Sequence, residues 1–476
     1  MSVRDKLKIT YVLVLVNSFL VSGCATLSIN DFFNGYAEQL TPAKNAIAAG
    51  NAKQAEQLLP KRSTSNNAYT LNLLEKGRVS FINQDYQESK SWFEQAYQQL
   101  EKDRAKAKLQ LSRGINNVSA MVSNDNAIGY QVPAYEQSML HTYQALNFIF
   151  SEQLESALVE VRRANQVQSL ALADYEKEIY EANKELKEVG QTSWSQSPLH
   201  KGLSAQANSV KNSIQNAYTF YLSGLLYEAD SQLNDAYIDY KKALEIFPDN
   251  RYVQQDVYRL AVKLNMTQDL PKLKESYGSF EQQSSNDTGQ VVFIVEQGLI
   301  ESRQELRLNL PISTRHGDFR TFNLALPGYS NRSNYGAEIS ASIDGETLNA
   351  QPIVKLQALA AKQLEEKMPA MIARQTLRLI AKEQVRRKLS KENGDVGNIL
   401  AGLYNLASER ADTRSWLTLP KDVQLLKTNL SAGEHNVSLN INGLPMNLPV
   451  SVEANKINFV FVEKIGQTSH WQSVAL

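Results

Sequence analysis

The chain contains 476 residues, and its 50 Lys and Arg residues are balanced by 50 Asp and Glu residues, so the formal net charge is +0. No block rich in Lys or Arg stands outside amphipathic helical segments, which argues against a nucleic-acid partner. The single cysteine excludes an intramolecular disulfide, and the length suggests two or three domains.

Residues 1–23 have the features of a secretory signal peptide. They begin with basic residues, continue with an apolar run at 9–20 that is too short for a stable transmembrane helix, and end in small residues. The signal ends in VSGC (21–24), which resembles the lipobox of bacterial lipoproteins. An ordinary signal peptide with an incidental cysteine is the alternative, but Cys24 is the only cysteine in the chain. We therefore predict cleavage before Cys24 and a membrane anchor of diacylglycerol and palmitate on this residue.

The residue after Cys24 bears on the destination of the protein. In Gram-negative lipoproteins, which this N-terminus resembles, an aspartate at that position retains the protein at the inner membrane. Ala25 stands there instead. The resemblance therefore implies the outer membrane, with the chain facing the periplasm and attached to the membrane through its N-terminal lipid; exposure at the cell surface remains an alternative.

Residues 41–277 show apolar side chains at three- and four-residue spacing, which predicts helices. The segment 217–250 resembles a tetratricopeptide repeat. Small residues stand where paired helices would cross, aromatic residues would fill the groove beside them, and a proline closes the unit. The residues that match are Phe220, Gly224, Tyr227, Ala236, Tyr240, Ala243 and Pro248. Ser223 departs from the pattern, which expects leucine there.

Weaker copies of the repeat precede this segment. The first has Gly77, Tyr86, Ser89, Phe93 and Ala96 at the matching positions, and the second has Ala145, Leu154, Ala157, Val161 and Ala164. Degenerate units at 46–59 and 252–277 extend the stack, and the spacing requires an insertion near 170–210. A generic helical bundle with chance alignment of alanines is the alternative for these outer copies.

The composition changes near residue 280. Residues 281–290 are predicted to be a linker, and strands are predicted at 291–298, 304–312, 319–329, 337–343 and 346–354, with a hairpin turn at Asp344-Gly345 between the last two. Helices are predicted at 353–368, from Pro369 onward, and at 397–410. Further strands are predicted at about 423–428, 435–442, 446–453 and 457–464.

These patterns predict an α+β multidomain fold, with an N-terminal tetratricopeptide-like helical solenoid and a mostly β C-terminal region. The predicted units are the signal peptide (1–23), the helical repeat domain (24–280) and an α+β domain (281–476) with β-sandwich-like strands and a helical insert at about 354–410. The lipobox, the repeats, the segment 411–420 and the β C-terminus together resemble a family of uncharacterised Gram-negative tetratricopeptide-repeat lipoproteins. The resemblance implies an architecture and a location, and it implies no activity.

The sequence contains no recognisable catalytic or metal-binding motif. The histidines His141, His200, His316, His435 and His470 are too far apart for a helical metal pair, and no nucleophile or phosphate-loop motif occurs. We therefore predict no catalytic residues, no metal and no cofactor.

One cluster of charged and aromatic residues has two interpretations. Arg410, Asp412, Arg414 and Trp416 provide two guanidinium groups and an indole, which suit a carboxylate or a sugar. The alternative is a structural role, in which Asp412 forms a salt bridge and Trp416 fills the join between the helical insert and the sheet. We favour the structural role, because buried Trp residues and Arg–Asp pairs often hold domains together.

Stacked helical repeats form curved solenoids whose concave face binds peptides or proteins. We therefore predict an outer-membrane-anchored scaffold that binds protein partners on this concave face, in cell-envelope assembly or maintenance, and not an enzyme. Two alternatives stay open. One is an enzyme that acts on peptidoglycan or glycan through its C-terminal domain, and the other is an accessory lipoprotein of an export or polysaccharide machine.

Overall fold

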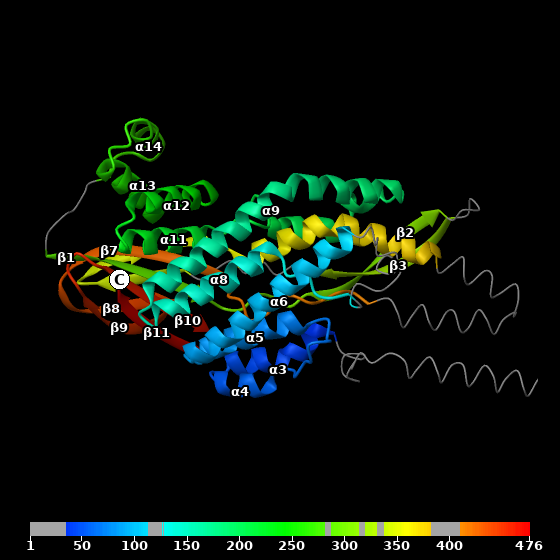
Figure 1. Cartoon of the computed structure of the whole chain (residues 1–476), viewed down its shortest axis with the longest axis horizontal. Helices are drawn as coiled ribbons and strands as arrows, with labels where there is room; N and C mark the ends of the chain where they lie inside the picture. Colours follow the sequence, from blue (N-terminus) through cyan, green and yellow to red (C-terminus); the bar gives the residue numbers. More distant parts are fainter. Residues whose placement is uncertain are drawn as a thin grey trace, which may run out of the picture.

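The computed structural model describes residues 35–112, 126, 128–280, 287–313, 319–330, 338–381 and 410–476. The predicted signal peptide, Cys24, His316 and nearly all of the helix predicted at 397–410 lie outside these residues. Within them, helices form the N-terminal part and strands most of the C-terminal part, with a long helix between strands (Figure 1). This arrangement confirms the predicted fold class.

The N-terminal helices follow one another as antiparallel hairpins. The pairs are α3 (Tyr36–Ala48) with α4 (Ala52–Leu58), α5 (Tyr69–Ile82) with α6 (Tyr86–Ser112), α8 (Ala134–Ile149) with α9 (Leu154–Glu188), α11 (Ala217–Ala229) with α12 (Leu233–Ile246), and α13 (Arg251–Lys263) with α14 (Leu270–Tyr277). The long α9, the 3-10 helix η2 (Thr192–Gln196) and α10 (Pro198–Ala207) occupy the region where the repeat spacing requires an insertion.

Small residues allow the two helices of a hairpin to approach closely. A Cβ atom added to Gly224 of α11 would lie 2.5 Å from the Tyr240 ring of α12. A Cβ atom added to Gly77 of α5 would lie 2.7 Å from the Phe93 ring of α6, at the equivalent position of its hairpin. Carbon atoms do not pack at such distances, so any side chain would displace the ring. The helical part is therefore tetratricopeptide-like.

Most of the other residues predicted to pack the repeats are buried. Those that are buried are Ala96, Ala145, Ala157, Val161, Ala164, Tyr227, Ala236 and Ala243. Pro248 is exposed and follows the end of α12, where it cannot continue the helix.

The strands form three sheets. Their bounds are β1 (Thr288–Gln297), β2 (Gln304–Ser313), β3 (Phe319–Gly328), β4 (Ile339–Ile343), β5 (Glu346–Asn349), β6 (Gln351–Val354), β7 (Asp422–Ser431), β8 (Gly433–Ile441), β9 (Leu444–Val452), β10 (Ile457–Ile465) and β11 (Thr468–Ala475). The main sheet has the order β11-β10-β1-β7-β6, in which β1 and β10 are parallel and the other neighbours antiparallel. A second sheet has the order β5-β4-β8-β9, and β2 pairs with β3.

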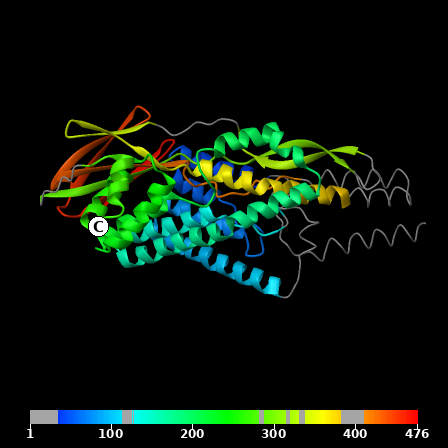
Figure 2. The same cartoon turned by 90° about the horizontal axis from the view of Figure 1, so that it is seen from above.

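The main sheet lies between the helices and the second sheet. Helices cover one of its faces, and Figure 2 shows them on one side of the orange and red strands. On the opposite face, Val452 of β9 lies beside Gly289 of β1. The central strands β1 and β10 are consequently buried along almost their whole length, as their nearly continuous apolar runs require.

Residues 356–381 form one continuous helix, which extends with the β2–β3 hairpin away from the main sheet (Figure 1). The prediction that a helix ends before Pro369 is wrong. Leu364, Met368, Met371 and Ile372 form a buried face on both sides of the proline, and this packing outweighs the hydrogen bond that proline removes.

Two other details differ from the predictions. The segment predicted as one strand up to residue 354 divides at Ala350 into β5 and β6, which belong to different sheets. Strand β11 was not predicted, because its partly exposed, mostly polar sequence lacks an apolar pattern. The turn at Asp344-Gly345 does join β4 to β5, with φ of 51° and 88° at its two residues, as this dipeptide favours. No helix in the described part of the chain is both long and apolar enough to cross a bilayer.

Candidate functional site

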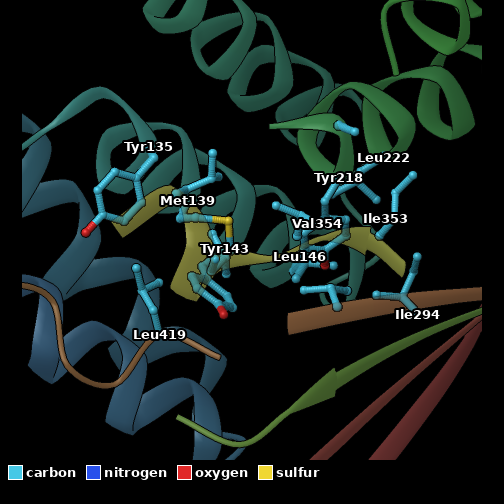
Figure 3. Close-up of a cluster of buried hydrophobic side chains, with 14 of the residues drawn as sticks. Tyr135, Met139, Tyr143, Leu146, Tyr218, Leu222, Ile294, Ile353, Val354 and Leu419 are labelled. Atoms are coloured by element: carbon cyan, nitrogen blue, oxygen red, sulfur yellow. The ribbon is translucent and has the colours of Figure 1, made fainter. Parts of the chain in front are cut away.

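The first helices of the hairpins lie against the main sheet. Figure 3 shows Tyr143 and Leu146 of α8 in one cluster of buried hydrophobic side chains with Ile294 of β1. The ring of Phe81 in α5 contacts that of Phe461 in β10, with 5.6 Å between the ring centroids. The chain's own sheet therefore fills the inner face of the helical stack, and the predicted location of a partner on that concave face requires correction.

A buried cluster of charges joins this face to the sheet where α5 and α8 cover it. Arg78 of α5 donates to Glu296 of β1 at 2.9 Å and to Glu463 of β10, and all three side chains are 0% exposed. Nε2 of His470 lies 3.0 Å from Glu463, and the Tyr143 hydroxyl donates to Glu296 at 3.0 Å. We call Arg78, Glu296, Glu463 and His470 the closed cluster.

The pKa values of the two carboxyl groups in the closed cluster are shifted in opposite directions. Burial raises the pKa of Glu296 to about 8, because one cation cannot compensate two adjacent carboxylates fully. Burial would also raise the pKa of Glu463, but Arg78 and His470 hold it below its ordinary value. At neutral pH the cluster therefore holds an ionised Glu463 and a largely protonated Glu296, and its groups bind one another.

The predicted cluster at 410–416 lies at the same join. Arg414 pairs with Asp412 at 2.7 Å and donates to the carbonyl oxygens of Asn67 and Ile128 at 3.2 and 2.9 Å. The Trp416 ring is buried beside Phe93 and Tyr143, whereas Arg410 is exposed. The structure thus places Asp412, Arg414 and Trp416 against the helices, but not Arg410.

Two buried glutamates hold the segment that follows. Glu75 of α5 accepts from the backbone N–H groups of Leu417 and Thr418 at 2.7 and 3.1 Å, and Glu136 of α8 accepts from that of Trp416 at 3.0 Å. Residues 416–418 are not part of a strand, so these carboxylates satisfy backbone N–H groups that have no partner in a sheet. Together with the Arg414 contacts, they make residues 411–419 part of the join between helices and sheet.

The other end of the main sheet is open to solvent. There the end of α11, the helix α13, the β5–β6 segment and the adjoining ends of β1, β7 and β10 surround a groove of about 1440 Å³. We call it the α13 groove. It is larger than the roughly 300–1,000 Å³ of most small-molecule pockets.

A second cluster of charges lies in the wall and floor of this groove. Asp256 of α13 accepts from Lys427 of β7 and, at 2.8 Å, from Arg259. Arg259 also donates to both oxygens of Glu228, at 2.6 and 2.8 Å, and the Tyr221 hydroxyl donates to Asp256 at 2.9 Å. We call Glu228, Asp256, Arg259 and Lys427 the open cluster.

Burial and pairing set the charges of the open cluster. Burial alone would raise the pKa of Asp256, but the Lys427 ammonium and the Arg259 guanidinium hold it below its ordinary value. Burial lowers the pKa of Lys427 against the opposing effect of Asp256. The Arg259 side chain remains 26% exposed, so the cluster meets solvent.

The rim of the groove carries further cations and aromatic rings. Arg251, Lys263 and Lys456 are exposed and line the groove. Tyr258 and Phe280 contact each other edge to face, with 5.6 Å between ring centroids. Among the described residues, no group of three His, Cys, Asp or Glu side chains could hold a metal ion.

Sequence reasoning did not find this groove. Asp256 and Arg259 stand three residues apart on a helix and look like an ordinary surface pair. A lysine within the apolar strand 422–431 was the one available signal, because a charge on a buried strand requires a partner. That partner is 171 residues away in the chain, and only the fold brings the two together.

Comparisons with known proteins add little to this description. A scan against protein-family models and a search of curated proteins found no match. Among solved structures, similar chains include "MamA 41-end from Desulfovibrio magneticus RS-1" and a "MamA RS-1 ArsTM double mutant". Each is 14% identical, with a TM-score of 0.27, over 51% of this chain and 90% of the MamA chain. The tetratricopeptide-like description rests on the helix contacts given above.

Proposed function

We propose that the protein is a protein-binding scaffold of the cell envelope. It is attached to the outer membrane through lipid on Cys24, faces the periplasm and serves envelope assembly or maintenance. Its partner binds in the α13 groove and not on the inner face of the helical stack. Tetratricopeptide-like helices are common protein-binding elements, which supports the general role.

The observation that carries this proposal is the contrast between the two faces of the helices. The inner face is filled by the main sheet, whereas the α13 groove is open, large and lined by charged and aromatic side chains. Interfaces between proteins are enriched in Arg and Tyr, and Arg251, Tyr252 and Tyr258 line this groove. We therefore assign partner capture to the groove.

We propose binding and not catalysis. The carboxylates buried in the main sheet, Glu296 and Glu463, contact Arg78 and lie under the helices. In the groove, Asp256 and Glu228 are held by Arg259. A general acid or base must reach its substrate, and these groups are engaged with cations instead.

Site-specific photo-crosslinking in intact cells tests the location of the partner. Asn349 is exposed and lines the groove, so the variant Asn349→p-benzoylphenylalanine should give protein adducts of defined mass. Gln98, exposed on α6, is the matched control position. Adducts from both positions alike, or none from Asn349, would contradict the proposal.

Labelling with a fatty acid tests the anchor. Cys24→Ser should abolish incorporation of radioactive palmitate and leave an unprocessed or soluble species. Ala25→Asp should keep the label but move the protein to the inner-membrane fraction. Label that persists on Cys24→Ser refutes lipidation, and unchanged fractionation of Ala25→Asp refutes the outer-membrane assignment.

A further inference from the structure

The charges of the α13 groove are unequal. Five cationic side chains line it, against the side-chain carboxylates of Glu228 and Asp256. Glu228 and Asp256 are already compensated by Arg259 and Lys427. The remaining cations are therefore Arg251, Lys263 and Lys456.

These cations are spread around the groove. Arg251 and Lys263 stand at the two ends of α13, and Lys456 stands in the turn before β10. Between them lie the open cluster and the rings of Tyr252 and Tyr258. A ligand that contacts all of them must therefore extend along α13 and cannot be a single small anion.

The open cluster has donors to offer such a ligand. An ammonium carries three donor hydrogens, and the contact of Lys427 with Asp256 uses one. A guanidinium carries five donor hydrogens, the contacts of Arg259 with Glu228 and Asp256 use three, and its side chain is 26% exposed. Carboxylates are the natural acceptors for both groups, and charge-assisted hydrogen bonds are about twice as strong as neutral ones.

The walls of the groove are fixed before any ligand binds. Asn250 caps α13 through the backbone N–H of Tyr252 at 3.1 Å and donates to the carbonyl oxygen of Pro352 at 3.0 Å. The Tyr252 hydroxyl donates to the carbonyl oxygen of Asn349 at 2.7 Å. These contacts fasten α13 to the β5–β6 segment, so little conformational entropy is lost on binding.

Resting on the proposed function, we propose that the α13 groove binds an extended acidic segment of the partner protein. Glutamate or aspartate side chains of that segment meet Arg251, Lys263 and Lys456 at the rim and Arg259 and Lys427 within. Its apolar side chains lie on Tyr252, Tyr258 and Phe280. A concave groove with aromatic walls suits a peptide better than it suits the flat surface of an anionic membrane.

Selection from a random dodecapeptide library displayed on phage tests this proposal. The purified mature protein is the bait, and a fluorescent copy of an enriched peptide is then titrated against variants. The test variant combines Arg251→Glu, Lys263→Glu and Lys456→Glu, all at exposed positions. The matched control combines Lys102→Glu, Lys187→Glu and Lys201→Glu, which reverses as many exposed charges away from the groove.

Enriched peptides should be acidic, and the test variant should bind them at least about tenfold more weakly while the control variant binds like the wild type. Affinity should also fall with added salt. Enrichment of non-acidic peptides, enrichment of none, equal binding by both variants, or binding only to phosphatidylglycerol vesicles would overturn the proposal. Crosslinking from Asn349 that survives the groove reversal would overturn the acidic segment alone and leave the scaffold function standing.

Discussion

The closed and open clusters use similar chemistry at two ends of one sheet. Each pairs an arginine with two carboxylates: Arg78 with Glu296 and Glu463, and Arg259 with Asp256 and Glu228. In the closed cluster the arginine of α5 reaches carboxyl groups on two strands, whereas in the open cluster these three side chains lie on helices and Lys427 of β7 makes the contact with the sheet. In the closed cluster Arg78, Glu296 and Glu463 are fully buried under α5 and α8 and His470 is 13% exposed, whereas the open cluster lines a groove. Burial thus makes one cluster a structural join and exposure makes the other available to a partner.

The largest effect should follow the loss of Arg78. Arg78→Met leaves Glu463 buried without its cation, and breaking a buried ion pair in this way costs about 3–5 kcal/mol. The free energy of unfolding from urea denaturation measures it. Arg78→Met combined with Glu463→Gln is the control, and it should recover part of the loss. A loss of less than about 1 kcal/mol for Arg78→Met would contradict the role of the closed cluster.

The next effect tests whether the α5–α6 and α11–α12 hairpins pack through the same kind of close helix crossing. Gly224→Leu should push against Tyr240, and Gly77→Leu against Phe93, each at a cost of about 1–3 kcal/mol. Thermal unfolding measures both variants. Gly129→Ala is the control, because an added Cβ there meets nothing within 4 Å. A neutral result at either position would show that its hairpin does not pack through a small residue.

The pH dependence of stability tests the protonation of Glu296 in the closed cluster. The pKa of Glu296 rises from 4.5 to about 8 in the folded protein, so between these values the unfolded chain releases a proton that the folded chain keeps. Stability should therefore fall as pH rises through this window, by at most about 1.4 kcal/mol per pH unit from this group. Glu296→Gln should make this slope less negative in denaturation curves at pH 5 to 8. An unchanged slope would show that Glu296 is not protonated in the fold.

The smallest effect on stability is expected at the open cluster. Lys427 and Asp256 are only 9% and 1% exposed, but Lys427→Met leaves Asp256 paired with Arg259. The loss should therefore stay below the roughly 3–5 kcal/mol expected for an uncompensated buried charge. The same urea denaturation measures it beside Arg78→Met. Equal losses for the two variants would erase the distinction between the clusters.

Local spacing explains what the sequence predicted well. Gly224 and Tyr240 are close in the chain, so the repeat pattern placed both at one helix crossing. The turn at Asp344-Gly345 is likewise a property of two adjacent residues. Such features depend on short segments whose residue types limit the backbone directly.

Long-range packing explains what the sequence did not predict. Arg78 and Glu463 are 385 residues apart, and nothing near either residue indicates the other. Burial of Met368 and Met371 keeps the helix continuous through Pro369, against the local preference of proline. The α13 groove escaped prediction for the same reason, because segments that are far apart in the chain, from Glu228 to Ile457, form it.

The most direct test of this contrast measures crosslinking from Asn349→p-benzoylphenylalanine in three backgrounds: the wild type, Lys427→Met and Arg78→Met. Yields are scaled to the amount of folded protein in each strain. We predict that Lys427→Met loses most of the adduct although it loses less stability than Arg78→Met, and that Arg78→Met keeps the adduct per folded molecule. An adduct that survives Lys427→Met but disappears from folded Arg78→Met would contradict the assignment of binding to the open end of the sheet.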